Sequence, residues 1–162
     1  MKKCGGIQNY CLEKQLLIEE LVVQNEIMNT LHRDSINTIR IMTYKGKPIT
    51  AILRMGVGNS NIDNASSGGI YAEVDINEGV VISLAMDYKG DEYIYHPTTR
   101  VIILGFKIPM WEKCLEFVAD TPLVGWDIAV GLNEPILIEV NERPDPFLKQ
   151  SPRKIGIKSL IK

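Results

Sequence analysis

The chain of 162 residues contains few of the side chains from which several common functional sites are built. Its three cysteines, Cys4, Cys11 and Cys114, show no CxxC spacing, and an odd number argues against a disulfide framework. Only two histidines are present, His32 and His96, so neither a histidine-rich metal site nor a paired histidine relay is expected. No GxSxG motif and no Ser, His and Asp arrangement appears. The sequence therefore disfavours disulfide scaffolds, zinc sites and hydrolytic triads.

The chain also lacks a charge excess and a long apolar run. Lys and Arg total 18 against 20 Asp and Glu, so the net charge of -2 does not indicate a nucleic-acid partner. The opening MKK is followed by CGGIQNY, and Glu19 and Glu20 interrupt LLIEELVV, so we expect neither a signal peptide nor a membrane span. A cytoplasmic protein is the resulting expectation. A hydrophobic content of 45% without repeats suits one globular domain.

Hydrophobic periodicity predicts an α+β fold built on a largely antiparallel sheet. Residues 15–23 fit a strand or a short helix, and their branched aliphatic side chains favour a strand. Residues 25–34 place Ile27, Met28 and Leu31 on one face of a short helix. Residues 36–55 read as two strands around a turn at 45–47.

The second half of the chain continues this pattern. Strands are expected at 70–76 and 80–86, on either side of a turn at 77–79. Residues 108–120 then fit a helix that packs on the sheet, with Trp111, Cys114, Leu115 and Val118 at helical spacing. The segments 124–130 and 135–141 read as two strands joined by the loop GLNE.

The last of these strands carries two polar side chains in an apolar run. Glu139 and Asn141 share one face because side chains alternate along a strand, and Asp127 lies across the predicted hairpin from them. Two carboxylates and an amide oxygen suit Mg²⁺. From spacing alone, polar positions that face water on a half-buried strand explain the pattern more readily.

Two arginines and a polar loop could supply an anion site. Arg40 lies inside a predicted strand and Arg54 ends the next, and guanidinium groups bind phosphate oxygens in forked geometry. A single strand arginine is more often a surface residue. The loop 56–69 contains Gly56, Gly58, Gly68 and Gly69, whose backbone N–H groups could face phosphate, yet the chain has no GxxxxGK[ST] motif. His96 precedes a proline and is expected to hold a turn.

An ordered set of motifs carries a resemblance to a known family. IEELVVQ, DSINTIRIMT, GVGNSNIDNASSGGI, HPTT with GFKIPMWEKC, VGWDIAV and ILIEVNERPD look like the carboxy-terminal half of an ATP-grasp protein. The resemblance is strongest to the sugar-transfer associated ATP-grasp family, which is related to carboxylate-amine ligases, and it covers roughly residues 16–147. It implies that ATP phosphorylates a carboxylate to an acyl phosphate, which an amine or similar nucleophile then attacks.

The resemblance also implies roles for individual residues. A hinge strand and a ribose contact would hold ATP, an arginine would meet the phosphate or acyl phosphate, a loop would close over the phosphates, and three oxygen ligands would bind Mg²⁺. The residues that match these roles are, in the same order, Glu19, Glu20, Leu21 to Val23 and Glu26; Arg40, with Arg54 as a second catalytic candidate; Asn64, Gly68 and Gly69; and Asp127, Glu139 and Asn141.

One departure from the family pattern concerns the amino-terminal side. Only about 15 residues precede LLIEELVV, and the lysine and glycine-rich loop of the preceding subdomain have no counterpart there. The expectation is a single partial ATP-grasp domain over 1–162 with a basic tail at 148–162. An alternative is a catalytically incomplete nucleotide- and metal-binding or assembly module, completed by a partner chain or by self-association. We expect the basic tail to be solvated rather than to bind a membrane surface.

Overall fold

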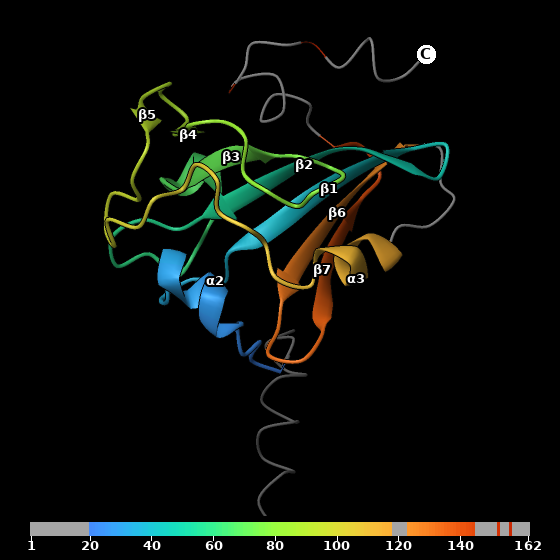
Figure 1. The fold of residues 1–162 in the computed structure, drawn as a ribbon, viewed down its shortest axis with the longest axis horizontal. Helices are drawn as coiled ribbons and strands as arrows, with labels where there is room; N and C mark the ends of the chain where they lie inside the picture. Colours follow the sequence, from blue (N-terminus) through green and yellow to red (C-terminus); the bar gives the residue numbers. More distant parts are fainter. Residues whose placement is uncertain (1–19, 118–122, 145–151, 153–155, 157–162) are drawn as a thin grey trace, which may run out of the picture.

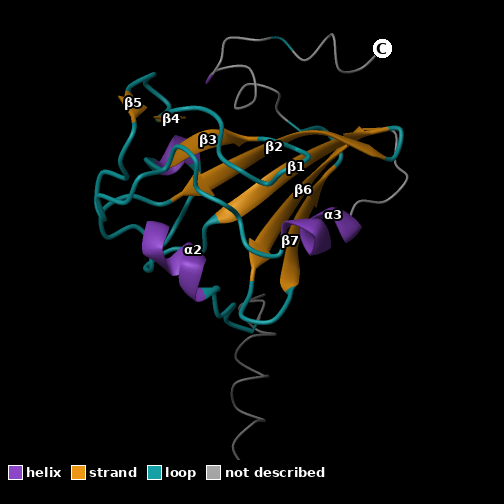
Figure 2. Cartoon of the chain, viewed as in Figure 1, coloured by secondary structure: helices purple, strands orange, loops and turns teal. Residues whose placement is uncertain are grey.

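The computed structural model describes residues 20–117, 123–144, 152 and 156, and one antiparallel sheet dominates this part of the chain (Figure 1). The sheet has seven strands in the order β5-β4-β3-β2-β1-β6-β7, so every neighbouring pair is antiparallel. Figure 2 shows how few helices accompany these strands. The expected α+β class with a largely antiparallel sheet is confirmed.

The elements follow one another closely along the chain. They are α2 (Glu26–Leu31), β1 (Thr38–Tyr44), β2 (Lys47–Met55), the 3-10 helix η1 (Ala65–Ser67), β3 (Ile70–Val74), β4 (Ala85–Met86), β5 (Glu92–Tyr93), α3 (Trp111–Glu116), β6 (Leu123–Val130) and β7 (Pro135–Asn141). No helix among the described residues has the length and hydrophobicity that a membrane crossing requires.

The two central hairpins form as their sequences predict. Lys45 and Gly46 link β1 to β2 with φ angles of 50° and 73°, and positive φ at both turn positions matches the twist of the flanking strands. The β6–β7 hairpin closes around the predicted GLNE loop, where the Gly131 amide donates to the Glu134 carbonyl at 3.0 Å. The two hairpins meet through the antiparallel pairing of β1 with β6.

One face of the sheet packs against both helices. Met28 and Leu31 of α2 and Trp111 and Cys114 of α3 are buried in the main hydrophobic cluster, as their spacing predicts. Burial raises the pKa of the Cys114 thiol to about 12, so this cysteine is a core residue. Ile27, which was expected on the same helical face, is 52% exposed, and Val118 lies outside the described residues.

Two predicted strands differ from the structure. Residues 20–23 have no regular structure, and Leu21 is 89% exposed; only Gln24 forms a single bridge, to Gly131. Residues 15–19 of that prediction lie outside the described part. In 80–86 only Ala85 and Met86 form a named strand. The Ser83 hydroxyl accepts a hydrogen bond from the Glu73 amide at 2.8 Å, so a side chain takes the place of a ladder carbonyl there.

Candidate functional site

The sheet face opposite the helices carries a row of directly paired side chains, most of them charged, across five strands. Direct pairing joins Glu73 to Ile52, Ile52 to Arg40, Arg40 to Asp127 and Asp127 to Glu139. Side chains of directly paired residues point to the same face, so this row runs from β3 to β7. The hairpin pairing that the sequence predicted for Asp127 and Glu139 is therefore present.

Asp127 is the centre of this row and is only 1% exposed. Arg40 donates from Nε to Oδ1 at 2.6 Å and from Nη2 to Oδ2 at 2.5 Å, which is the forked geometry of a bidentate pair. Arg54 donates from Nη2 to the same Oδ2 at 3.1 Å. The two arginines that the sequence singled out thus converge on one buried carboxylate.

A second carboxylate holds the other side of Arg54. Arg54 donates from Nη2 to the Thr38 hydroxyl at 2.7 Å, and that hydroxyl donates in turn to Asp63 Oδ2. The Thr38 amide also donates to Asp63 Oδ2 at 2.9 Å, and Arg54 Nε lies 3.7 Å from the same oxygen. We call Thr38, Arg40, Arg54, Asp63 and Asp127 the arginine–carboxylate cluster.

The acidic surroundings keep Arg40 charged. Its hydrogen bonds to Asp127 and the charges of Asp127, Glu139 and Asp63 raise the pKa of the guanidinium, and they outweigh the burial that lowers it. The side chain of Arg40 is 14% exposed and that of Arg54 is 10% exposed. Asp127 uses two of the five N–H donors of Arg40, and the charges of Asp127, Glu139 and Asp63 offset that of the guanidinium.

The three predicted metal ligands lie at the β6–β7 end of the row. Glu139 is exposed and Asn141 is half-buried. With its amide oriented to satisfy both neighbours, Asn141 donates to Glu139 Oε1 at 3.3 Å and accepts from Arg40 Nη2 at 3.3 Å. At Asp127, Oδ2 already accepts from both arginines, and Oδ1 accepts from one. The donor types suit Mg²⁺, and Oδ1 keeps one lone pair for it.

This arrangement differs from a site built only from carboxylates and imidazoles. Within the ranges 20–117 and 123–144, no group of three or more His, Cys, Asp or Glu side chains is placed to hold a metal ion. A cation bound here would therefore need the Asn141 amide oxygen and a lone pair of Asp127 that neither arginine uses. The metal-ligand roles of Asp127, Glu139 and Asn141 stay predictions.

The loop 56–69, which we call the glycine loop, is anchored beside the cluster. Ala65 packs with Ile52, Tyr71 and Met86 in a small hydrophobic cluster on this face, and the neighbouring Asp63 binds Thr38. Gly69 needs its small size, because a Cβ there would lie 2.4 Å from the Asp63 carbonyl oxygen.

The predicted phosphate contacts of the loop divide into two kinds. The Gly68 and Gly69 amides donate to the Ala65 and Asn64 carbonyls, so these glycines shape the loop through its own hydrogen bonds. The Asn64 side chain is exposed and makes no capping hydrogen bond to η1. Among the predicted loop residues, Asn64 is therefore the side chain best placed to meet a ligand.

The predicted adenine and ribose residues lie apart from this geometry. Glu20, Leu21, Val23 and Glu26 are exposed, and no hydrogen bond or ion pair within the described ranges joins them to the arginine–carboxylate cluster. Glu19 lies outside the described residues. Since the expected strand is absent at 20–23, the backbone of this segment does not form a hinge strand here.

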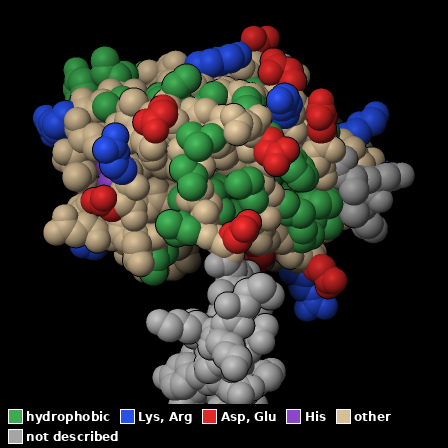
Figure 3. All heavy atoms as spheres, turned by 90° about the horizontal axis from the view of Figure 1, so that it is seen from below, with side chains coloured by type: hydrophobic (Ala, Val, Ile, Leu, Met, Phe, Trp, Pro, Cys, Tyr) green, Lys and Arg blue, Asp and Glu red, His purple; other side chains and the backbone are tan. Residues whose placement is uncertain are grey.

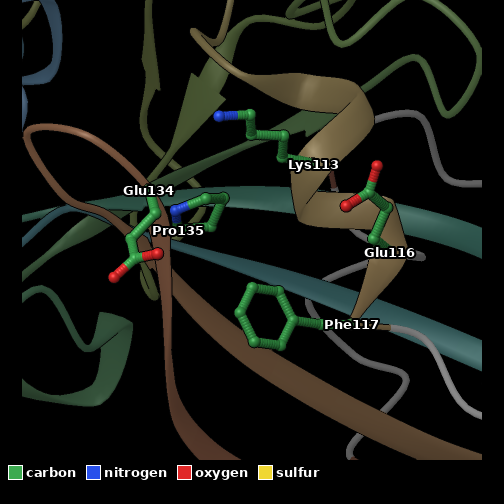
Figure 4. A pocket seen from close by; sticks show the side chains of 5 residues that line it. All are labelled: Lys113, Glu116, Phe117, Glu134 and Pro135. Carbon is green, nitrogen blue, oxygen red and sulfur yellow. The ribbon is translucent and has the colours of Figure 1, made fainter.

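A cavity of about 380 Å³ lies elsewhere, between α3 and the start of β7 (Figure 4). Its lining includes Lys113, Glu116, Phe117, Glu134 and Pro135. Because α3 packs on the core face of the sheet, this cavity is separate from the arginine–carboxylate cluster on the opposite face. None of its lining residues was predicted to be functional.

Sequence reasoning missed two members of the cluster. Asp63 lies in a loop without periodicity, and Thr38 is one of two threonines in β1, with no feature of the sequence that sets it apart. The sequence signal for Asp63 is its place directly before Asn64 in the motif DNASSGG. Both residues hold Arg54 and the glycine loop together.

Comparison with known protein families identifies the chain. The family model described as sugar-transfer associated ATP-grasp matches residues 8–162. No curated protein and no solved structure matches the chain. The match covers nearly the whole sequence, including every residue of the cluster.

Proposed function

The chain belongs to the sugar-transfer associated ATP-grasp family, and from this premise we propose that it is an ATP- and Mg²⁺-dependent, ligase-type module that activates a carboxylate substrate. The observation that carries the proposal is the convergence of Arg40 and Arg54 on the buried Asp127, directly beside the glycine loop. The name of the family supports a place in sugar-transfer or cell-surface polysaccharide pathways.

In the proposed reaction, a carboxylate oxygen of the substrate bonds to the γ-phosphorus of ATP while the bond from that phosphorus to the β,γ-bridging oxygen breaks. ADP leaves. An amine or similar nucleophile then bonds to the acyl carbon of the acyl phosphate, the bond from that carbon to the phosphate oxygen breaks, and inorganic phosphate leaves together with the proton of the nucleophile. Bound at Asp127, Glu139 and Asn141, Mg²⁺ would neutralise phosphate charge. Arg40 and Arg54 would donate N–H groups to the transferred phosphoryl oxygens, and Asn64 would approach from the loop. The chain then acts mainly by positioning.

Calorimetric titration of the purified chain with a nonhydrolysable ATP analogue tests this proposal. We expect saturable binding with Mg²⁺ and none with EDTA, because the carboxylates repel unneutralised phosphate. Binding that is equally tight under both conditions would contradict the proposed metal site. An absence of binding under both conditions would contradict the proposal that this chain alone forms the nucleotide site.

A second candidate, an assembly module that associates through β7, rests on the surface of that edge strand. Leu137, Ile138 and Val140 are 38%, 48% and 45% exposed, and Ile138 is an extra residue where the pairing shifts register. Within the described residues, β7 is an edge strand that pairs only with β6, and an edge strand with exposed apolar side chains is a template for another chain. Figure 3 shows apolar side chains gathered on the face seen from below.

Sedimentation velocity at increasing protein concentration tests self-association through β7. We expect the wild type to form dimers. The substitution Ile138→Lys should weaken the affinity of dimerisation by at least about tenfold, since a lysine charge buried in the interface disfavours the contact. Ile102→Lys is the matched control, because Ile102 is 55% exposed on a different segment. A wild-type chain that stays monomeric throughout, or equal effects of the two substitutions, would rule out this interface.

A further inference from the structure

We propose that His32 and His96 are positioning residues, which act as a neutral pair that fixes the start of the glycine loop and thereby sets where Asn64 stands beside the arginine–carboxylate cluster. The inference rests on the proposed function for what the loop contacts. It assigns a task to the only two histidines of the chain, which come from α2's carboxyl end and from the HPTT turn.

Both rings are buried and lie against each other. His32 is 1% exposed and His96 is 0% exposed, and their centroids are 5.6 Å apart with 30° between the ring planes. The His32 ring nitrogen Nε2 lies 2.9 Å from the Gly58 carbonyl oxygen, and that of His96 lies 2.8 Å from the Gly56 carbonyl oxygen. Two rings therefore hold two carbonyls at the beginning of one loop.

The remaining nitrogens fix the protonation state. Nδ1 of His96 accepts from the Thr98 and Thr99 amides at 3.2 Å and 3.3 Å. Nδ1 of His32 accepts from the Ser35 amide at 3.2 Å and lies 2.9 Å from the Ser35 hydroxyl, which in this assignment donates to it. A nitrogen that accepts from an amide carries no proton, so each ring is neutral and protonated at Nε2. Nε2–H then donates to the loop carbonyl in both cases.

Neighbouring contacts from Thr98 and Thr99 support the histidine pair, and we call these four residues the clamp. The Thr98 hydroxyl accepts from the Gly58 amide at 2.7 Å, and the Thr99 hydroxyl donates to the Leu31 carbonyl at 2.8 Å. A Cβ at Gly56 would lie 2.3 Å from Ser35 Oγ and 3.0 Å from His32 Nδ1, so the loop start is pressed against the clamp. Downstream, Asp63 provides the second anchor, and Asn64 follows it directly.

Acid should weaken the clamp. Burial lowers the pKa of His96, and the nearby His32 ring lowers it further, against the hydrogen bond to Gly56 that raises it. The charged residues adjoining the pair, Arg33, Asp34 and Arg100, are exposed. A proton on His96 Nδ1 would face two amide N–H groups. When the clamp opens, His96 regains its ordinary pKa of about 6.5, so below that pH the opened state binds protons more readily than the closed state. The clamp therefore loses stability as the pH falls through the lowered pKa of His96.

Amide hydrogen exchange of the full chain without nucleotide tests the clamp directly. The reporters are the Gly58, Ser67 and Gly69 amides in the loop, with the Gly105 amide as comparator because it donates to Val81 away from the loop. Between about pH 7.5 and pH 5, we expect the protection factors of the reporters to fall at least about tenfold relative to Gly105. The double variant His32→Gln/His96→Gln, which keeps side-chain donors but cannot gain charge, should lose this pH dependence.

Two further measurements separate the clamp from simple packing. Nitrogen-15 chemical shifts of the two imidazoles in the wild type should show both rings neutral and protonated at Nε2 near neutral pH. This measurement needs no variant, so it tests the proposal even if a variant fails to fold. His96→Leu should lower loop protection at neutral pH more than His96→Gln. A ring protonated at Nδ1, or loop protection that follows Gly105 at every pH, would overturn the proposal.

Nucleotide titration in parallel tests the positioning role. We expect the affinity of the wild type for the Mg²⁺-bound ATP analogue to fall with the same pH dependence as loop protection, and to fall less in the double glutamine variant. Loop protection that changes while wild-type affinity does not would overturn the positioning role. If the wild type binds no nucleotide, the proposed function fails, whereas the exchange data still decide whether the clamp exists.

Discussion

Replacing Asp127 by alanine is expected to lower the free energy of unfolding by about 3–5 kcal/mol and to abolish Mg²⁺-dependent nucleotide binding. The carboxylate is 1% exposed and accepts hydrogen bonds from both Arg40 and Arg54, so its removal leaves two largely buried cations without their shared partner. Urea denaturation followed by circular dichroism measures the stability change, and titration calorimetry measures binding. Unchanged stability would contradict the central structural role of Asp127.

Glu139→Ala separates binding from folding in the same experiment. Glu139 is exposed, so its removal should change the unfolding free energy by no more than about 0.5 kcal/mol. Binding of the Mg²⁺-bound ATP analogue should nevertheless be lost, because a predicted metal ligand is gone. Glu142→Ala is the matched control, since it removes an exposed carboxylate just beyond β7. Tight binding that survives both Asp127→Ala and Glu139→Ala would exclude the proposed site.

The parts of this site that sequence predicted share one property, which is that local spacing determines them. Strand alternation puts Glu139 and Asn141 on one face and the short hairpin loop brings β6 beside β7, while the extra residue Ile138 within the same hairpin sets Asp127 opposite Glu139. The β1–β2 hairpin follows from its alternation around Lys45 and Gly46, and His96 holds a turn as its place before a proline indicates. In each case, residues close in sequence supply all the information needed.

The parts that sequence could not predict depend on contacts between distant segments. The bond from Thr38 to Asp63 spans 25 residues, and the convergence of Arg40 on Asp127 spans 87. The segment 20–23 shows the opposite case. Its branched aliphatic residues favour a strand, yet the structure provides only the bridge from Gln24 to Gly131. Propensity is not enough where tertiary structure offers no strand to pair with.

Asp63→Ala is expected to release the glycine loop and to lower the free energy of unfolding by about 3 kcal/mol. Asp63 is 8% exposed; it accepts from the Thr38 amide and hydroxyl, and Arg54 Nε lies 3.7 Å away. Without it, a buried amide loses its acceptor, and Asp127 is the one carboxylate of the cluster that remains beside Arg54. Denaturation gives the stability change, and hydrogen exchange at the Thr38 and Gly69 amides shows whether the loop opens.

Nucleotide binding should fail along with the loop, because Asn64 follows Asp63 directly and moves with it. Asp63→Asn keeps an oxygen acceptor for Thr38 but loses the charge near Arg54, so its loss of stability should be smaller. Asp75→Ala is the matched control: Asp75 accepts from the Asn77 and Glu78 amides in another turn, and its removal should cost about 1 kcal/mol without affecting binding. If Asp63→Ala and Asp75→Ala behave alike in both assays, Asp63 is an ordinary turn residue. A selective loss of loop protection and affinity in Asp63→Ala would instead make Asp63 the residue through which the loop's position and the charge balance of Arg54 are linked.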